Sequence, residues 1–445
     1  MSTKNKITDN VFIRYYFIIY YLYMMSVNVI IPNKGIGAVL INGLLFSFLI
    51  FATIVSGKYN KKFKYIYFYI IFLFLLVLLQ SSNHQYSFTN LIKYSMGLLC
   101  LPLGFNILSS QEKFRDFQRT GIYLLLLYLI NVLFANIFHW GDFYGYEIEN
   151  GLEIGNVFSD GLYLNVYVIT SIFLLIVLYP LKKHKYTLLL VLAICAILII
   201  VNMKRMVILL LLVGLISYIF FHYFNNGFKS KLSLMQFKYL TLFLILALIV
   251  LPMFYPYIQR SFETREKKFE KSREDIMQEG RMLEFKYISE EIVQFDDIST
   301  FLFGKETFNL VGTYGGGLFG NRPIHGDYSK LLHGTGVAGV LFWLCIHLHL
   351  IIWIVRLKKS VYTKTDALAS IIFPLYFSFI IIYCLSMMSG VMGCVISSSF
   401  FYASLGGMLR YFFNKRIFFL QCKDNIYFSS MDINPKKINK FKFQS

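Results

Sequence analysis

The sequence predicts an all-α polytopic integral membrane protein with about twelve transmembrane helices and one long outer helical loop. Hydrophobic residues make up 57% of its 445 residues and charged residues only 15%, whereas an ordinary soluble protein carries about 25% charged residues. Apolar runs of about 18 or more residues recur along the whole chain. These runs are about twice as long as the alternating segments of a membrane β-barrel, and the first is too long for a cleaved signal peptide.

The apolar runs define the expected spans, and prolines such as Pro32 and Pro180 mark several of their ends. We place the spans at 12–31, 35–56, 64–80, 91–108, 120–138, 162–179, 186–201, 206–223, 238–257, 335–355, 367–386 and 390–413.

Charge in the connections between spans predicts the orientation. Lys and Arg occur near both chain ends and in alternate connections, at 58–64, 113–119, 182–185, 229–238 and 356–364. The intervening connection 80–90 has no charged residue, and 139–161 has five acidic residues but no Lys or Arg. Basic residues gather on the cytoplasmic side of membrane proteins, so both termini are expected there. This rule also accounts for the net charge of +19 without a nucleic-acid partner.

The resulting organisation has four parts. Residues 1–257 hold helices one to nine, and 258–334 form a long periplasmic loop that carries the polar motifs. Residues 335–413 hold helices ten to twelve, and 414–445 form a basic cytoplasmic tail. Six cysteines lie in apolar runs or in the tail, and no C-x-x-C pair occurs, so neither a disulfide nor a metal cluster is expected.

The first polar site candidate is Lys204-Arg205, in a tight outer turn. The preceding run, Tyr186–Val201, would form a helix of roughly 24 Å, shorter than the hydrocarbon core of about 30 Å. Arg205 is therefore expected at membrane depth or at the outer rim of the membrane, where a charge indicates function. The alternative is an Arg at a helix end that extends its charge to water.

The long outer loop is expected to contain two helices. Residues 259–278, which include Arg260 and Arg265, alternate in charge and predict a solvated helix. After Gly280, a second helix is expected over 281–294, with one apolar face formed by Met282, Phe285, Ile288 and Ile292. Arg281 would lie in its first turn, where the helix dipole and a bidentate guanidinium both favour phosphate. Pairing of Arg281 with a neighbouring Glu is the alternative.

His325 follows Arg322 in the same loop, about ten residues before span ten. A His at the outer membrane surface can act as a general base near neutral pH, and Asp327 could orient it if the backbone turns. An ordinary loop His is the competing interpretation. His347 and His349 are two residues apart on a helix and do not share a face, so no metal site is expected. Gly336 and Gly339, and later Gly390, Gly393, Gly406 and Gly407, are expected to allow close helix packing.

Together these motifs form an ordered pattern. An Arg opens a span after a tight outer turn, Gly280-Arg281 begins a loop helix, a Phe-Leu-Phe-Gly304 segment follows, and His325-x-Asp-Tyr leads through two glycines into a span. In this order and placement the chain resembles the O-antigen ligase and polymerase superfamily of bacterial membrane glycosyltransferases, whose fold is of the C type. Lys204 stands where that family often has Ser, and Asp327 where it often has Asn.

The resemblance implies a metal-independent glycosyltransferase without a cofactor. Its donor and acceptor would be oligosaccharides linked to undecaprenyl diphosphate, at the outer face of the bacterial inner membrane. Arg205 and Arg281 would bind the diphosphate, and His325 would be the catalytic base. Possible glycan or phosphate contacts are Lys204, Arg260, Arg265, Arg322 and Asp327. Membrane lipids and a chain-length regulator protein are the expected partners.

Three activities remain open. An O-antigen polymerase would transfer the growing glycan onto a new lipid-linked repeat unit, and an O-antigen ligase would transfer it to lipid A–core. We favour the polymerase because of the chain's size, its composition and the acidic loop 139–161 as a second outer segment. A flippase for lipid-linked oligosaccharides would instead place charge in a cavity between two repeated halves, and this chain shows no such symmetry.

Overall fold

The computed structural model describes the chain in blocks. They are residues 36–57, 59–110, 205–226, 280–293, 297–308, 324–359, 367–390 and 395–429, together with Tyr16, Ile19, parts of 112–130 and the pairs 142–143 and 155–156. Some helix ends, including 205–208, 280–282 and 419–429, are described by their backbone alone. The predicted spans 162–179, 186–201 and 238–257 and the predicted helix 259–278 lie outside the described residues, as do most of 12–31 and much of 120–138.

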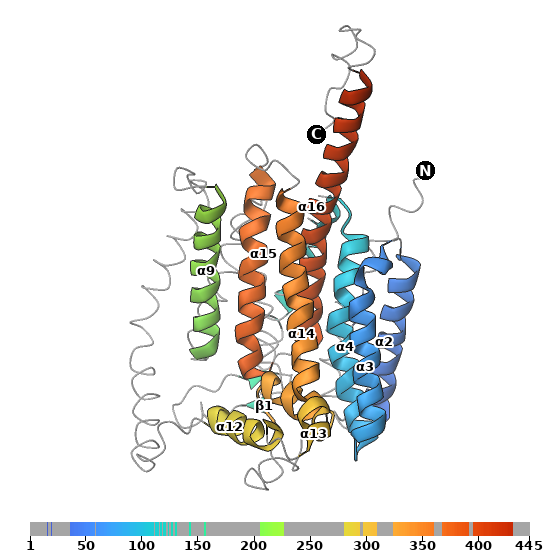
Figure 1. Cartoon of the computed structure of the whole chain (residues 1–445), viewed down its shortest axis with the longest axis vertical. Coiled ribbons are helices and arrows are strands. Elements are labelled where there is room, and N and C mark those ends of the chain that lie inside the picture. The colour runs from blue at the N-terminus through green and yellow to red at the C-terminus, as the bar shows by residue number, and fades with distance from the viewer. Residues whose placement is uncertain are drawn as a thin grey trace.

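In the part of the chain that the structure describes, long helices form an upright bundle, and shorter helices lie across one of its ends (Figure 1). The upright helices are α2 (Ile36–Val55), α3 (Lys64–Gln80), α4 (His84–Ile107), α9 (Arg205–Asn226), α14 (Asp327–Lys359), α15 (Ala367–Ser386) and α16 (Val395–Ser429). The crossing helices are α12 (Gly280–Val293) and α13 (Ile298–Phe303). Two short 3₁₀ helices, η1 (Asn60–Phe63) and η4 (Met387–Ser389), precede α3 and follow α15.

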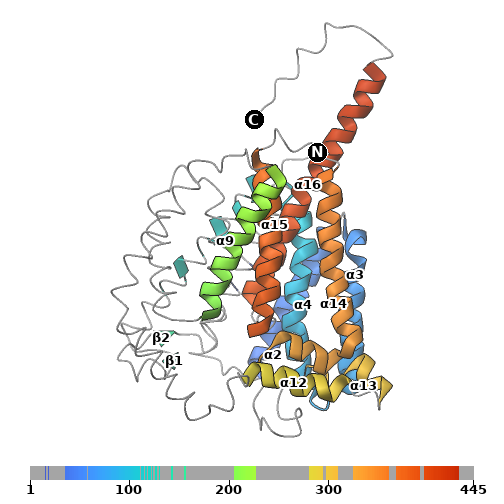
Figure 2. The same ribbon diagram turned by 60° about the vertical axis from the view of Figure 1, so that its left-hand side comes forward.

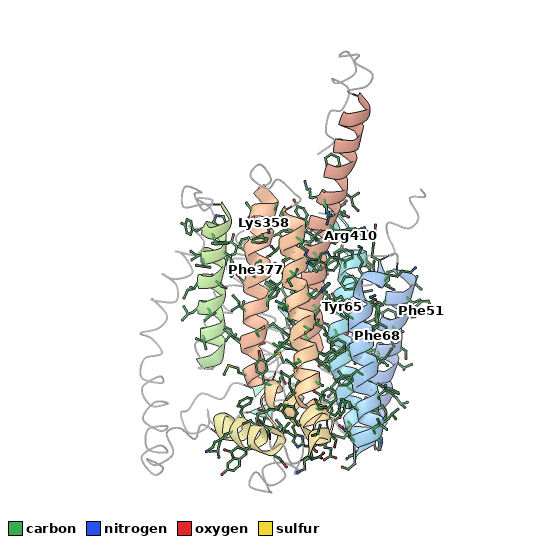
Figure 3. All side chains as sticks on the ribbon, in the orientation of Figure 1. Phe51, Tyr65, Phe68, Lys358, Phe377 and Arg410 are labelled. Atoms are coloured by element: carbon green, nitrogen blue, oxygen red, sulfur yellow. The ribbon has the colours of Figure 1, made fainter. Side chains whose placement is uncertain are left out.

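Within the described residues, three helical stretches are long and apolar enough to cross a membrane. They are Asn60–Gln80, Asp327–Lys359 and Ala369–Ser386, and two shorter apolar helices cover Leu40–Val55 and Leu212–Phe224. The outward surface agrees, because large apolar side chains such as Phe51 and Phe68 are 62% and 60% exposed (Figure 3). Apolar helices with such a surface indicate a membrane protein.

Helix limits were predicted best where an apolar run ends abruptly. Helices α3 and α15 cover the expected 64–80 and 367–386. Helix α4 begins at His84 rather than at 91, because the Asn83 side chain caps it by accepting from the Tyr86 N–H at 3.2 Å. Helix α16 continues to Ser429, well into the predicted tail.

The core of the bundle brings α4 and α16 together through glycines. A Cβ at Gly104 would lie 2.3 Å from the carbonyl oxygen of Ala403, and a Cβ at Gly406 would lie 2.3 Å from that of Leu101. Only glycine permits this approach of two helix backbones. The expectation of close packing at Gly406 is therefore confirmed, with α4 as its neighbour.

Helix α14 begins earlier than predicted and bends where a loop was expected to end. It starts at Asp327, not at 335, and Gly336 interrupts it with φ 59° and ψ −164°. A Cβ at Gly336 would come within 2.5 Å of the Leu302 carbonyl group, so α13 occupies the space beside the bend. The Lys305 N–H and the Thr307 hydroxyl then donate to the carbonyls of His333 and Gly334, at 2.8 and 2.6 Å. These contacts hold α13 against the first turns of α14.

One end of the bundle is rich in basic residues. Away from α12 and α13 lie Lys358 and Arg410, labelled in Figure 3. The same end carries the basic residues of η1 and of the last turn of α14, which are Lys61, Lys62, Arg356 and Lys359. Helix α16 projects beyond the bundle at this basic end (Figure 2).

One small feature departs from the all-α prediction. Residues Asp142–Phe143 (β1) and Gly155–Asn156 (β2) form a two-stranded antiparallel ribbon, with Asp142 opposite Asn156. The ribbon falls inside the acidic connection 139–161, where no strand was expected. Its register brings the two sides of that connection together.

Candidate functional site

The three principal site candidates lie at the same end of the bundle, opposite the basic end. Helix α9 begins at Arg205, α12 begins at Gly280-Arg281, and His325 directly precedes α14 (Figures 1 and 2). The direction of α9 follows from its contacts, because His222 near its end bonds the backbone of Ser370 near the start of α15. The other end of α15 lies near His325, because Gly390, the residue after η4, contacts the His325 backbone. The start of α9 is therefore on the same side of the bundle as His325.

Glu284 holds the backbone around His325. One carboxylate oxygen, Oε1, accepts the backbone N–H groups of His325 and Gly326 at 2.9 and 3.1 Å. The other, Oε2, lies 3.7 Å from the imidazole Nδ1 of His325. The Glu284 side chain is fully buried, whereas the His325 side chain is 36% exposed. A buried carboxylate therefore supports an imidazole that solvent or a substrate can reach.

The electrostatics of Glu284 favour its charged form. Burial alone would raise the pKa of this carboxyl, but hydrogen bonds from His325 and Gly326 outweigh burial and hold the pKa below its ordinary value. The carboxylate is thus negative at neutral pH, and a protonated His325 would form an ion pair with it.

An apolar cluster fixes this segment onto α12. Ile324, just before His325, packs with Ile288 and Ile292 in a small buried cluster, and Tyr86 and Leu332 cover its edge. The buried face of α12 therefore runs through Glu284, Ile288 and Ile292. The predicted face was wrong at Phe285, which is 44% exposed, because Glu284 takes the buried position to reach the His325 backbone.

The end of α15 closes the other side of the segment. The Tyr328 hydroxyl donates to the Cys384 carbonyl at 2.8 Å. Gly390, with φ 86°, lies so close that a Cβ there would be 2.5 Å from the His325 carbonyl oxygen. His325 is therefore enclosed by α12, the start of α14 and the turn after η4.

Asp327 has a cationic partner on its own helix. Its carboxylate is fully buried and pairs with the Lys330 ammonium at 3.0 Å, one turn further along α14. Glu284, and not Asp327, supplies the carboxylate that holds the His325 backbone. Lys330 is 14% exposed and brings a cation close to His325, since its Nζ would lie 3.4 Å from a Cβ at Gly390.

The remaining candidates are placed only in part. The backbones of Arg205 and Arg281 open α9 and α12, and their side chains lie outside the description. Lys204, Arg260, Arg265 and Arg322 lie outside the described residues altogether.

Glu284 and Lys330 were not found by sequence reasoning. A signal for Glu284 existed, because it lies four and eight residues before Ile288 and Ile292, on the face that an apolar residue would normally occupy. A carboxylate in such a row indicates a buried polar partner elsewhere in the chain. Lys330 carried no comparable signal.

Among the described residues, no group of three or more His, Cys, Asp or Glu side chains is arranged to hold a metal ion. His333 and His347 are buried, and His347 bonds the Trp343 carbonyl and the Tyr402 hydroxyl at 3.0 and 3.1 Å. His349 lies on the other side of α14 and packs on the Tyr65 ring. His347 and His349 are thus structural and do not share a face, as expected.

The chain matches no family model, and no curated protein matches its sequence.

Proposed function

We propose that this chain is a bacterial membrane glycosyltransferase that elongates a surface polysaccharide. In this proposal it transfers a growing glycan from undecaprenyl diphosphate onto a new lipid-linked repeat unit, as an O-antigen polymerase does. About twelve spans of a C-type glycosyltransferase fold would place both termini in the cytoplasm. The end of the bundle with α12 and α13 would then face the periplasm.

The observation that carries the proposal is the position of His325. A part-exposed imidazole is held at the end of the bundle opposite Lys358 and Arg410, where α9 and α12 also begin with Arg205 and Arg281. The lysines described at this end, which are Lys286, Lys305 and Lys330, each have a carboxylate nearby. By the positive-inside rule that end would be the outer one, where the resemblance to O-antigen polymerases would place the transfer. A base and two arginines at this end are the groups that transfer from a diphosphate requires.

The chemistry balances without a further reagent. The acceptor hydroxyl oxygen forms a bond to the anomeric carbon of the donor, and the bond between that carbon and the phosphate oxygen breaks. The electron pair of the broken bond leaves with undecaprenyl diphosphate, whose charge Arg205 and Arg281 would stabilise. The hydroxyl proton passes to His325, which is worth about 10²–10⁴-fold in rate.

The test is a surface-glycan gel of a strain that lacks the gene, complemented with the wild-type or variant chain. The polymerase predicts loss of the ladder with survival of core carrying one repeat unit. Full-length polymer left on the lipid carrier would mean a ligase, and single units stranded on the inner leaflet would mean a flippase.

The variant His325→Ala is expected to insert normally and to fail to restore the ladder. The matched control is His84→Ala, since His84 is an exposed imidazole at the same end of the bundle, at the start of α4. Full-length polymer from the His325→Ala chain would exclude His325 as the base.

A further inference from the structure

The contacts of Glu284 define a role that the proposed function does not include. Its carboxylate is fully buried, yet one oxygen binds the backbone of His325 and Gly326 while the other faces the His325 ring. A buried carboxylate needs compensation, and two backbone N–H groups supply it at Oε1. Oε2, 3.7 Å from Nδ1, is then the atom that a change of charge on the imidazole affects directly.

We propose that Glu284 is a positioning residue that orients His325 and stabilises its protonated form during glycosyl transfer. This inference rests on the proposed function. Oε2 favours the tautomer with the proton on Nδ1, which makes Nε2 the atom that accepts the proton of the acceptor hydroxyl. The imidazolium formed in this step faces the Glu284 carboxylate, and its proton later passes to water. Glu284 itself touches no reacting atom.

The location of Glu284 adds a link to the donor. Arg281, three residues earlier on α12, lies one helical turn away from Glu284. The helix that begins with the proposed diphosphate ligand therefore also carries the residue that orients the base. In this arrangement, a movement of α12 when the donor binds would also move Glu284, which holds the His325 backbone.

The other charged groups of the described segment do not duplicate this role. Lys330 and Asp327 pair with each other across one turn of α14. On α12, Glu290 lies near the exposed Lys286 at 3.9 Å, and Glu291 pairs with Lys305. Glu284, by contrast, has a carboxylate oxygen 3.7 Å from the His325 imidazole.

The experiment compares pH–rate profiles of the full chain in lipid nanodiscs, supplied with the lipid-linked repeat units that accumulate in the deletion strain. Glu284→Gln keeps an oxygen for the two backbone N–H groups but removes the charge. We expect its acid limb to move to lower pH, because the charge that faces the imidazole is gone, and its maximal rate to fall about tenfold or more. Glu290→Gln, which removes an exposed charge from the same helix, is expected to leave both unchanged.

A second comparison separates orientation from general structural support. Because Glu284 acts through His325, adding Glu284→Gln to His325→Gln is expected to cause no further loss of rate. A further loss in the double variant, or a wild-type profile in Glu284→Gln, would contradict the proposed role of Glu284. Neither result touches the proposed activity, which fails instead if the strain that lacks the gene keeps its full ladder on the surface-glycan gel.

If Glu284→Gln protein does not accumulate in the membrane, Glu284→Asp carries the test. Its charge remains while its carboxylate is withdrawn by one methylene group. The acid limb is then expected to stay in place and only the maximal rate to fall. A shifted limb or an unchanged maximum would contradict the assignment.

Discussion

Gly390 and His325 are in direct backbone contact, so close that a Cβ on Gly390 would lie 2.5 Å from the His325 carbonyl oxygen. The two residues come from different parts of the chain, the turn after η4 and the segment before α14. Gly390 also has φ 86°, a conformation that residues with a side chain rarely adopt. The turn after η4 thus fixes the position of the His325 backbone by direct contact.

This contact predicts the effect of Gly390→Ala. The methyl group would displace the His325 backbone, and a shift of about 1 Å at a catalytic group can cost roughly 10²-fold in rate. We expect normal membrane insertion and a strongly reduced ladder on the glycan gel. Gly43→Ala is the control, because a Cβ at Gly43 on α2 meets nothing within 4 Å. Equal activity of the two variants would show that the contact with Gly390 does not position His325.

A second prediction concerns the pair of Lys330 and Asp327. Lys330→Met leaves the buried Asp327 carboxylate without its ammonium partner at 3.0 Å, and breaking such a pair costs roughly 3 kcal/mol. Adding Asp327→Asn removes the uncompensated charge and should restore most of the lost stability. Thermal unfolding of the purified protein in detergent measures both effects.

The control for this pair is Lys286→Met, which removes an exposed lysine near Glu290 and should change stability little. A double variant no more stable than Lys330→Met would show that Lys330 supports the fold by its packing rather than by its charge.

The sequence predicted the limits of some helices better than the contacts around His325. His325 was identified from its place before an apolar run, and α3 and α15 from the limits of theirs. Glu284 was missed because its partners, His325 and Gly326, lie 41 and 42 residues further along the chain. Helical periodicity reports which residues share a face, and it does not report which backbone a buried carboxylate meets.

The start of α14 shows the same limit. Polar residues and glycines from His325 to Gly334 were interpreted as a loop, yet the helix begins at Asp327. The helix tolerates them because Lys330 neutralises Asp327 and because α13 fills the space beside Gly336. Both causes are tertiary contacts, which a single sequence does not reveal.

The third prediction follows from the lowered pKa of Glu284. Burial opposes this shift, and the hydrogen bonds from His325 and Gly326 produce it. The stabilisation is therefore fully present above the ordinary carboxyl pKa of 4.5 and is lost as pH falls through the lowered value.

Hydrogen exchange of the His325 and Gly326 amides, corrected for the intrinsic effect of pH, measures this loss. Their protection should fall on acidification below pH 4.5, while amides in the middle of α15 stay protected. In Glu284→Gln the protection should no longer depend on pH in this range. Protection that declines equally in α15 would indicate global unfolding instead.

The last prediction tests the proposed diphosphate ligand at the start of α12. Arg281→Lys keeps the positive charge but loses the planar fork that binds two phosphate oxygens at once. The loss of one charge-assisted hydrogen bond, about 1.5–3 kcal/mol, corresponds to roughly 10–10²-fold in rate. We expect this loss in nanodiscs with the accumulated lipid-linked units, together with a pH–rate profile that keeps the wild-type acid limb, because Glu284 and His325 are unchanged.

Arg119→Lys, at an exposed ion pair with Asp116, is the matched control. A wild-type rate in Arg281→Lys would mean that Arg281 acts as a simple point charge or not at all, and a shifted acid limb would mean that it acts on His325 rather than on the donor.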